Sequence, residues 1–482
     1  MFWSSKLKTN HLSSGARGVD RCRPWQGVSV ISQAASIFAL CCLVITAIAP
    51  VSAQGNTYTE RLERTAALIN RDQLSEAEQQ LNAILKLAPN QAVALNLLGT
   101  VRAKQGRLDD AEALFTRSIQ SDKQLVGAYM NLAYLYLLKG QPEKATLQLK
   151  EVLRIQPGNA DASYRLAWLL FTLGRFDESI GVINTAKQSQ PLTVPLLNLL
   201  GNAHLKKRDL GNAEAAYLKV LSEQGSNADA LLGMAAIAQV RHDAQTTSLY
   251  LGRAKDVITE SPDLLQKFAL VAQNSDLKNE ALWALKRAIE LRPKESSYYF
   301  ALGLAELIDP ADLQESETVF QQFLKLQPEN ARGQLYLGYV LLKQKKHAEA
   351  RVWLEKSMQK ETGTPETFYY LGLIAKEQND NSRAIEFLAK AIQMAPSYSS
   401  AHVALGATYL KLKDYSGAQQ AFETAVKLDP DDSKAHYNLA LLFARLKNQE
   451  RAQQEMRIVE NLRKAGKSQT SEEDVTPPPP NE

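Results

Sequence analysis

Two histidines are of a type, and at a spacing, that could bind a metal ion. His402 and His436 stand 34 residues apart, and the stacked helices of a repeating protein would bring them close together. A zinc site needs three or four ligands, and no carboxylate cluster accompanies the pair at ligand spacing. Equivalent positions elsewhere hold Tyr129, Tyr299 and Phe368, so this position is typical of rings that pack between helices. We therefore expect no metal site.

A second motif has the ending of a phosphate-binding loop. The motif is Ala465-Gly466-Lys467-Ser468, but Asn461 stands at the position where such a loop needs its first glycine. No strand precedes the motif, although a phosphate loop follows a strand. No other catalytic signature is present. We therefore expect a protein that is not an enzyme and that needs no cofactor.

The elements that would position such side chains recur with a period of 34 residues. Glycine or alanine occurs at each step, always after a large apolar residue, and one extra residue is inserted after Gly303. The series is Gly99, Ala133, Ala167, Gly201, Ala235, Ala269, Gly303, Gly338, Gly372, Gly406 and Ala440. A fixed period of this size indicates an array of stacked repeats, each one a supersecondary element.

A second series of small residues follows the first by about twelve positions, and prolines often close the repeat. The second series includes Ala111, Ala145, Ser179, Ala213 and Thr247, and the prolines are Pro89, Pro157, Pro191, Pro293, Pro328, Pro396 and Pro430. Small residues allow two helices to approach closely, and a proline ends the second helix because it cannot continue one.

These positions resemble the tetratricopeptide repeat family, whose 34-residue unit is a helix–turn–helix. The resemblance covers twelve repeats that start near residues 58, 92, 126, 160, 194, 228, 262, 296, 331, 365, 399 and 433. It predicts an all-α fold over residues 58–466. It also implies a right-handed superhelical solenoid that is stabilised by contacts between neighbouring repeats. The extra residue lies within Asp309-Pro310-Ala311-Asp312, where it is either ordinary loop variation or a hinge.

Residues 1–53 have the order of a targeting segment. Five basic residues and one acidic residue account for the whole net charge of +4. An apolar run over residues 34–49 and a small-residue sequence ending at Ala53 follow, as in a cleaved secretory signal. The run is shorter than the ~20 apolar residues of a membrane-spanning helix. We expect an exported, periplasmic protein that begins at Gln54; an uncleaved membrane anchor and an organelle transit peptide are the alternatives.

The rest of the chain has balanced charge, and this gives no argument for a nucleic-acid partner. All three cysteines, Cys22, Cys41 and Cys42, lie in the targeting segment. The exported chain would therefore contain no disulfide and no thiolate metal site.

The sequence predicts that residues 467–482 form a disordered, proline-rich tail. Four consecutive prolines, Pro477 to Pro480, favour an extended polyproline conformation. The tail is either a solvated end or a short motif for a proline-binding partner.

The resemblance implies a concave groove, lined by the first helix of each repeat, that binds a protein or peptide. Tyr134 and Trp168 hold equivalent groove positions one repeat apart. The expected groove residues are Met130, Tyr134, Leu137, Tyr164, Trp168, Phe171, Asn198, Asn202, Phe300, Tyr339, Tyr369 and Tyr437. The alternative is that these rings pack between helices.

We therefore expect a non-enzymatic scaffold that binds a protein or peptide in the bacterial cell envelope, in envelope assembly or secretion. The alternative is a regulatory or substrate-recruiting subunit of an enzyme complex. Membrane contact is expected only if the N-terminal segment is not cleaved.

Overall fold

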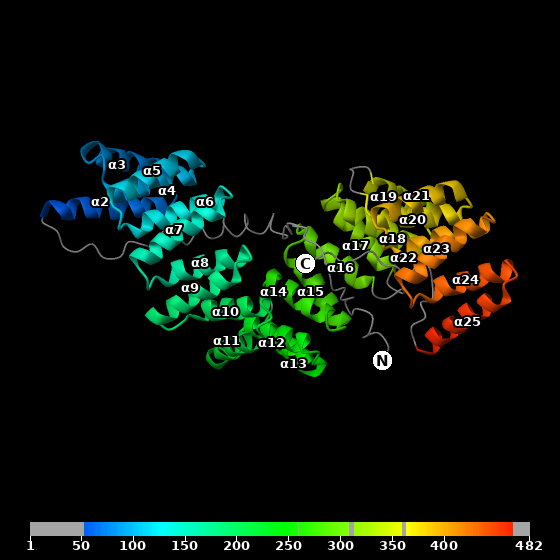
Figure 1. Ribbon diagram of the computed structural model, residues 1–482. Coiled ribbons are helices and arrows are strands. Elements are labelled where there is room, and N and C mark those ends of the chain that lie inside the picture. Colours follow the sequence, from blue (N-terminus) through cyan, green and yellow to red (C-terminus); the bar gives the residue numbers. More distant parts are fainter. Residues whose placement is uncertain (1–52, 259, 308–312, 359–362, 466–482) are drawn as a thin grey trace. The chain divides into compact units, whose positions relative to one another are not determined.

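The computed structural model describes residues 53–258, 260–307, 313–358 and 363–465. Every regular element in these ranges is a helix, and they contain no strand (Figure 1). The all-α prediction is therefore confirmed. The chain divides into two compact units, with the boundary between Thr193 and Val194.

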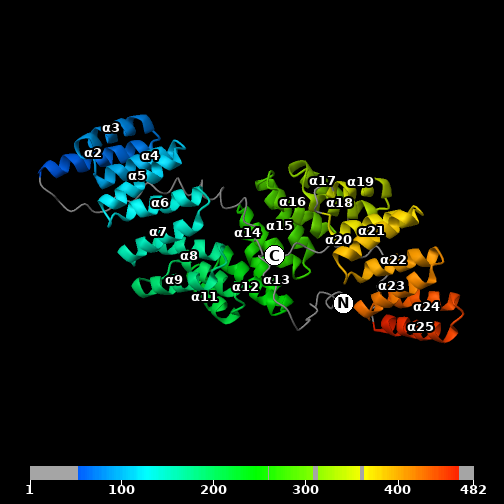
Figure 2. The ribbon, with the colours of Figure 1, turned by 45° about the horizontal axis from the view of Figure 1, so that its top comes forward.

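In its described residues the first unit consists of helix pairs that follow one another along the chain (Figure 2). Its helices are α2 (Ala53–Asn70), α3 (Leu74–Leu87), α4 (Ala92–Lys104), α5 (Leu108–Ser121), α6 (Val126–Leu138), α7 (Pro142–Ile155), α8 (Ala160–Thr172) and α9 (Phe176–Ser189). Each pair packs its own two helices together, and within the unit the second helix of one pair contacts the first helix of the next.

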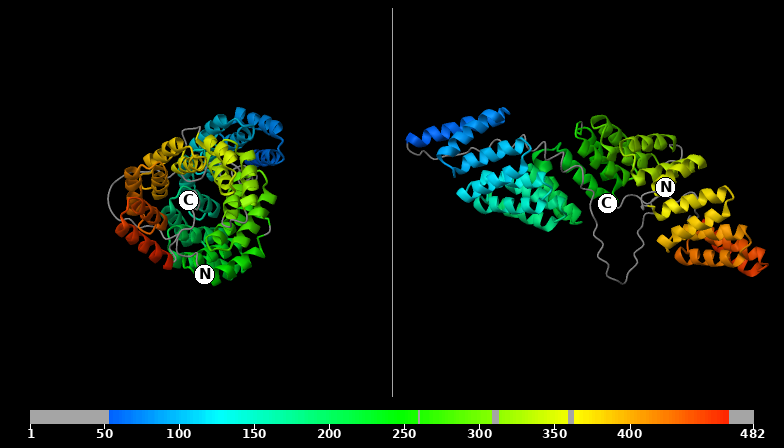
Figure 3. Two further views of the ribbon diagram at one scale, coloured as in Figure 1. Left: turned by 90° about the vertical axis from the view of Figure 1, so that its right-hand side faces the viewer. Right: turned by 90° about the horizontal axis from the view of Figure 1, so that it is seen from above.

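The second unit continues the same pattern, and its successive pairs follow a curved path (Figure 3). Its helices are α10 (Val194–Lys206), α11 (Leu210–Glu223), α12 (Ala228–Val240), α13 (Ala244–Lys255), α14 (Pro262–Gln273), α15 (Lys278–Leu291), α16 (Ser296–Glu306), α17 (Leu313–Leu326), α18 (Ala331–Lys343), α19 (His347–Met358), α20 (Pro365–Glu377), α21 (Asn381–Met394), α22 (Ser399–Lys411), α23 (Tyr415–Leu428), α24 (Ser433–Arg445) and α25 (Gln449–Lys464).

The predicted repeat starts agree with the helix starts from residue 92 to residue 433, because a helix begins at each of those positions. The first helix differs. It begins at Ala53 rather than near residue 58, because residues 53–57 hold none of the positions that define the repeat. Helix starts inside the array have local causes as well. The Asn159 and Asn227 side chains, for example, accept hydrogen bonds from the first turns of α8 and α12.

In the described turns inside the repeats, one residue lies in the left-handed region of backbone space. In the first unit this residue is glycine at three of the turns, Gly106, Gly140 and Gly174. Elsewhere it carries a side chain: Asp72, Arg208, His242, Asp276, Lys345, Asn379, Lys413 and Lys447. The backbone N–H groups after the helix close back onto its last carbonyls, as Gly106 and Arg107 do onto Ala103 and Arg102. These left-handed residues recur with the period of the repeat, so the described turns share one geometry.

The two series of small residues place the helices of a pair in close contact. Where the second helix presents a ring, the facing residue of the first helix is glycine. These pairs are Gly99 with Phe115, Gly201 with Tyr217, Gly303 with Phe320 and Gly406 with Phe422. A Cβ atom added at Gly406 would lie 2.6 Å from a Phe422 ring carbon, so no larger residue fits there. Repeats with alanine at the first position carry no ring at the second, as in Ala133 and Leu149.

Several sequence-based predictions concern residues that the structure does not describe. Residues 1–52 of the targeting segment, the insertion within Asp309-Pro310-Ala311-Asp312, Gly466-Lys467-Ser468 and the tail at 467–482 lie outside the described ranges. Among the helices that are described, none is long and apolar enough to cross a membrane.

Candidate binding surface

Helices α6 and α8 bring six of the expected groove residues to adjacent faces in the first unit. Met130, Tyr134 and Leu137 lie on α6, and Tyr164, Trp168 and Phe171 lie on α8. In each helix the three side chains are spaced four and then three residues apart, so they share one face. We call these six residues the α6–α8 aromatic surface.

The six side chains differ in how much they are exposed. Tyr164 exposes 37% of its surface, whereas Met130 and Tyr134 are buried. Leu137 and Trp168 are half-buried and pack against the same hydrophobic cluster. The surface therefore has a packed base and an aromatic side chain at its edge.

A charged residue that the sequence analysis did not select lies within this surface. The Arg165 guanidinium lies 4.7 Å from the centre of the Tyr134 ring and 2.7 Å from the Asp161 carboxylate. Such a cation over a ring is attracted by its π face. The signal was present in the sequence, since Asp161 and Arg165 are four residues apart on α8, where opposite charges meet.

A lysine at the end of α6 fixes this helix against α5. The Lys139 ammonium lies 2.7 Å from the Asp109 carboxylate and 2.6 Å from that of Glu112. These hydrogen bonds raise the pKa of Lys139 and lower the pKa of each carboxyl group. Tyr136 also donates to Glu112. The end of α6 is therefore held by charged hydrogen bonds rather than by apolar contacts alone.

On α10, the two expected asparagines hold neighbouring elements. Asn202 accepts a hydrogen bond from the Tyr217 hydroxyl at 3.0 Å. That hydroxyl belongs to a fully buried ring packed between Gly201 and Gly233, and burial raises its pKa. Asn198 is buried and donates to the side chain of Asn227, the residue that caps α12. Both amides thus have a structural role in the second unit.

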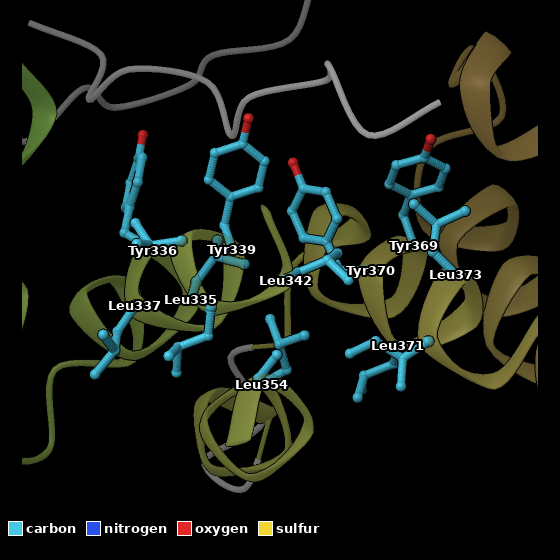
Figure 4. Close-up of a cluster of buried hydrophobic side chains, with 14 of the residues drawn as sticks. Leu335, Tyr336, Leu337, Tyr339, Leu342, Leu354, Tyr369, Tyr370, Leu371 and Leu373 are labelled. Carbon is cyan, nitrogen blue, oxygen red and sulfur yellow. The ribbon is translucent and has the colours of Figure 1, made fainter. Parts of the chain in front are cut away.

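Three of the remaining expected rings are buried in the core of the second unit. Phe300, Tyr339 and Tyr369 belong to one hydrophobic cluster, and Tyr339 and Tyr369 are both in ring contact with Tyr370. Figure 4 shows the hydroxyl ends of Tyr336, Tyr339, Tyr369 and Tyr370 pointing to one side, with Leu337, Leu354 and Leu371 lying on the other.

The last expected ring, Tyr437 on α24, is exposed over 46% of its surface. The structure brings the expected residues together within the α6–α8 aromatic surface and within the core cluster of the second unit. The binding role of all twelve residues stays a prediction.

The histidine pair makes hydrogen bonds to the protein backbone. His402 and His436 each contact the carbonyl oxygen of the proline six residues earlier through Nε2, at 3.1 Å in both cases. Nδ1 of His436 lies 2.6 Å from the Glu455 carboxylate. Among the described residues, no group of three or more potential ligands has the arrangement of a metal site.

Three family models, each described as a tetratricopeptide repeat, match this chain. One matches residues 147–202 and 375–441, a second matches 66–125 and 311–360, and a third matches 126–159 and 194–227. Together these matches cover more than half of the chain. They fall in both units.

Two curated relatives carry the name protein O-mannosyl-transferase TMTC3. The human protein is 22% identical over 267 residues, which are 54% of this chain and 29% of that protein. The mouse protein is 30% identical over 117 residues, which are 22% of this chain and 13% of that protein. The chain therefore matches less than a third of the length of these relatives.

Among solved structures, a tetratricopeptide repeat protein from Parabacteroides merdae ATCC 43184 is similar to part of the chain. It is 18% identical, with a TM-score of 0.42, and the match covers 52% of this chain and 99% of that one.

Proposed function

This chain belongs to the tetratricopeptide repeat family, and from that membership we propose that it is a non-enzymatic scaffold that binds a protein or peptide partner. The binding site that we propose is the α6–α8 aromatic surface. A scaffold of this kind acts by holding a partner in place, so its chemistry is that of recognition.

The arrangement of aromatic side chains and Arg165 on α8 is the observation that carries this proposal. Tyr164 is exposed, Trp168 is half-buried, and Arg165 lies between the Tyr134 ring and the Asp161 carboxylate. Tryptophan, tyrosine and arginine are the residue types that most often dominate binding energy at protein interfaces. These side chains rest on buried residues, so they lose less conformational entropy when a partner binds.

A second candidate is a substrate-recruiting or regulatory role within an enzyme complex. The likeness to proteins named as O-mannosyl-transferases favours it. Since the match covers under a third of those proteins, the proposal extends to recruitment and not to transfer of a sugar. A stoichiometric enzyme partner in a native complex would support this candidate.

The finer proposal is export, with a role in envelope assembly or secretion in a bacterium. It rests on the order of basic residues, apolar run and small residues that ends at Ala53. N-terminal sequencing of the protein from its native source tests it. A mature chain beginning at Gln54 supports export, whereas a chain that retains Cys41 and Cys42 contradicts cleavage.

The binding proposal is tested by affinity purification of the full chain from its source, followed by binding measurements with the partner recovered. Trp168→Ala should weaken binding by about 2 kcal/mol or more if the residue is a hot spot. Trp283→Ala is the matched control, because Trp283 is also half-buried but lies on α15, the second helix of its pair. Equal affinities for Trp168→Ala and wild-type protein would contradict the proposed site.

A further inference from the structure

A pocket of about 270 Å³ lies between α17, α18 and α19 in the second unit. Leu324, Gln334 and Trp353 are among its lining residues, and Pro328 and Lys356 are exposed residues that also line it. These residues do not belong to the α6–α8 aromatic surface, so the pocket needs its own explanation.

The pocket forms at a position where five other repeats have a ring, at Tyr129, Tyr299, Phe368, His402 and His436. In three other repeats, a ring stands six residues after the closing proline and hydrogen-bonds to the proline carbonyl oxygen. Tyr299 does so with Pro293 at 3.0 Å, and His402 and His436 do so with Pro396 and Pro430 at 3.1 Å. At the equivalent position Gln334 donates to the carbonyl oxygen of Pro328 at 2.8 Å. Gln334 thus keeps the hydrogen bond of these rings without occupying a ring's volume.

The next repeat has a ring at this position. Phe368 stands one repeat after Gln334, and its ring lies so close to Gly363 that an added Cβ atom there would come within 2.9 Å of it. Gln334 is itself only 6% exposed, so its amide lies at the base of the pocket and does not extend into solvent. The pocket is therefore bounded by the fixed amide of Gln334, by apolar side chains and by the charged residues Glu329 and Lys356.

The wall of the pocket has the chemistry that attracts an aromatic ring. The Lys356 ammonium lies 4.1 Å from the centre of the Trp353 ring. A second ring entering here could meet the Trp353 ring in an offset or edge contact and present its π electrons to the Lys356 cation. Leu324 supplies apolar surface beside it. An aliphatic side chain in this pocket would gain only the burial of apolar surface area.

We propose that this pocket is a second recognition site, which takes the aromatic side chain of a phenylalanine or tyrosine from a partner protein. The partner's ring would occupy the place that Tyr299, Phe368 and His402 occupy from within their own repeats. The site is independent of the α6–α8 aromatic surface, so loss of binding at one does not predict loss at the other.

The test uses the full chain with nitrogen-labelled tryptophan and the probe N-acetyl-L-phenylalaninamide. The indole N–H signal of Trp353, assigned from its loss in Trp353→Phe, should shift on titration with a dissociation constant on the order of 1 mM, as for a fragment of this size. N-acetyl-L-leucinamide should bind about fivefold more weakly, because it lacks the aromatic contact. A Trp353 signal that does not move with the phenylalanine probe overturns the proposal.

The matched variant is Gln334→Phe, which fills the pocket with the residue found at the equivalent position in the next repeat. It should retain or raise the melting temperature, and the probe should no longer shift Trp353. If that variant fails to fold, Gln334→His replaces it, since the His402 ring makes the same hydrogen bond to Pro396, and it should weaken the probe at least several-fold. Unchanged probe affinity in either folded variant overturns the proposal.

Discussion

Tyr164 and Tyr369 occupy the same position in their repeats, yet one is exposed and the other is buried. Tyr164 on α8 exposes 37% of its surface, and Tyr369 on α20 exposes 1%. The ring on α8 thus meets solvent, the ring on α20 is part of a core, and Tyr437 at the same position of α24 is 46% exposed. Position in the repeat alone therefore does not decide whether a ring binds or packs.

The residue next to each tyrosine explains the difference. Arg165 follows Tyr164 and makes an ion pair with Asp161, and a charged group of this kind stays near water. Tyr370 follows Tyr369, and their ring centres lie 5.4 Å apart. In the second unit, aromatic neighbours extend the cluster from repeat to repeat, whereas in the first unit a cation interrupts it.

The largest expected effect comes from removing a ring of the second unit's core. Phe300→Ala should lower the free energy of unfolding by about 3–5 kcal/mol, because Phe300 is buried against Phe320, Phe323 and Tyr336. Urea denaturation followed by circular dichroism measures this loss. Phe171→Ala, the same change at a half-buried ring of the first unit, should cost clearly less. Equal losses would remove the contrast between the two units.

Alkaline pH should destabilise the aromatic core of the second unit through Tyr336. Burial raises the pKa of this side chain to about 12, whereas an unfolded tyrosine has a pKa of about 10. The folded state therefore retains the proton longer, and the associated stability, about 2–3 kcal/mol, is present below pH 10 and is lost as the pH rises towards 12.

Unfolding measured from pH 9 to pH 12 checks this prediction. The loss of stability should be smaller in Tyr336→Phe than in the wild-type protein. Tyr164→Phe, at the exposed ring of the first unit, is the control and should change the profile less. If Tyr336→Phe shows the full alkaline loss, Tyr336 does not cause it.

A methyl group at Gly406 should separate the two helices of its repeat. Gly406→Ala should cost about 1–3 kcal/mol, because the new Cβ atom would lie 2.6 Å from the Phe422 ring. The double variant Gly406→Ala with Phe422→Leu recreates the combination of Ala133 and Leu149 in the first unit. Thermal melting of the double variant should recover part of the loss. A fully additive double variant would show that the ring and the glycine are not coupled.

The smallest expected effect concerns the turns, where the two units again differ. Lys413 adopts a φ of 64° in the second unit, and Gly140 adopts 67° in the first. Lys413→Gly should raise stability by up to about 1 kcal/mol, and Gly140→Ala should lower it by about the same amount, because only glycine enters this region without steric cost. Melting curves of both variants decide the sign, and a stabilised Gly140→Ala would contradict the reasoning.

The fold was predictable from the sequence because its signals repeat. Small residues such as Gly99 and Ala133 mark where two helices touch, and prolines such as Pro157 mark where a repeat ends, so eleven helix starts from residue 92 onward could be placed. The start of α2 could not, since its first five residues occupy no defining position of the repeat.

The candidate surface was less predictable, because burial depends on neighbours from other repeats. The sequence places Tyr339 and Trp168 in equivalent positions, but only the structure shows that Tyr339 meets Tyr370, at 5.3 Å between ring centres. The role of Asn202 likewise depends on the Tyr217 hydroxyl, which reaches it from the second helix of the same repeat. Such contacts depend on side-chain length and direction, which a repeat register does not specify.

The central claim is that Tyr164 on α8 belongs to a surface, whereas the equivalent Tyr369 on α20 belongs to a core. Tyr164→Ala and Tyr369→Ala test it most directly, because the same atoms are removed at equivalent positions of two repeats. The measurement is the free energy of unfolding of each variant in urea. We expect a loss of about 3–5 kcal/mol for Tyr369→Ala and of less than about 1 kcal/mol for Tyr164→Ala. Losses of equal size would contradict the claim, because Tyr164 would then be a packing residue rather than part of a binding surface.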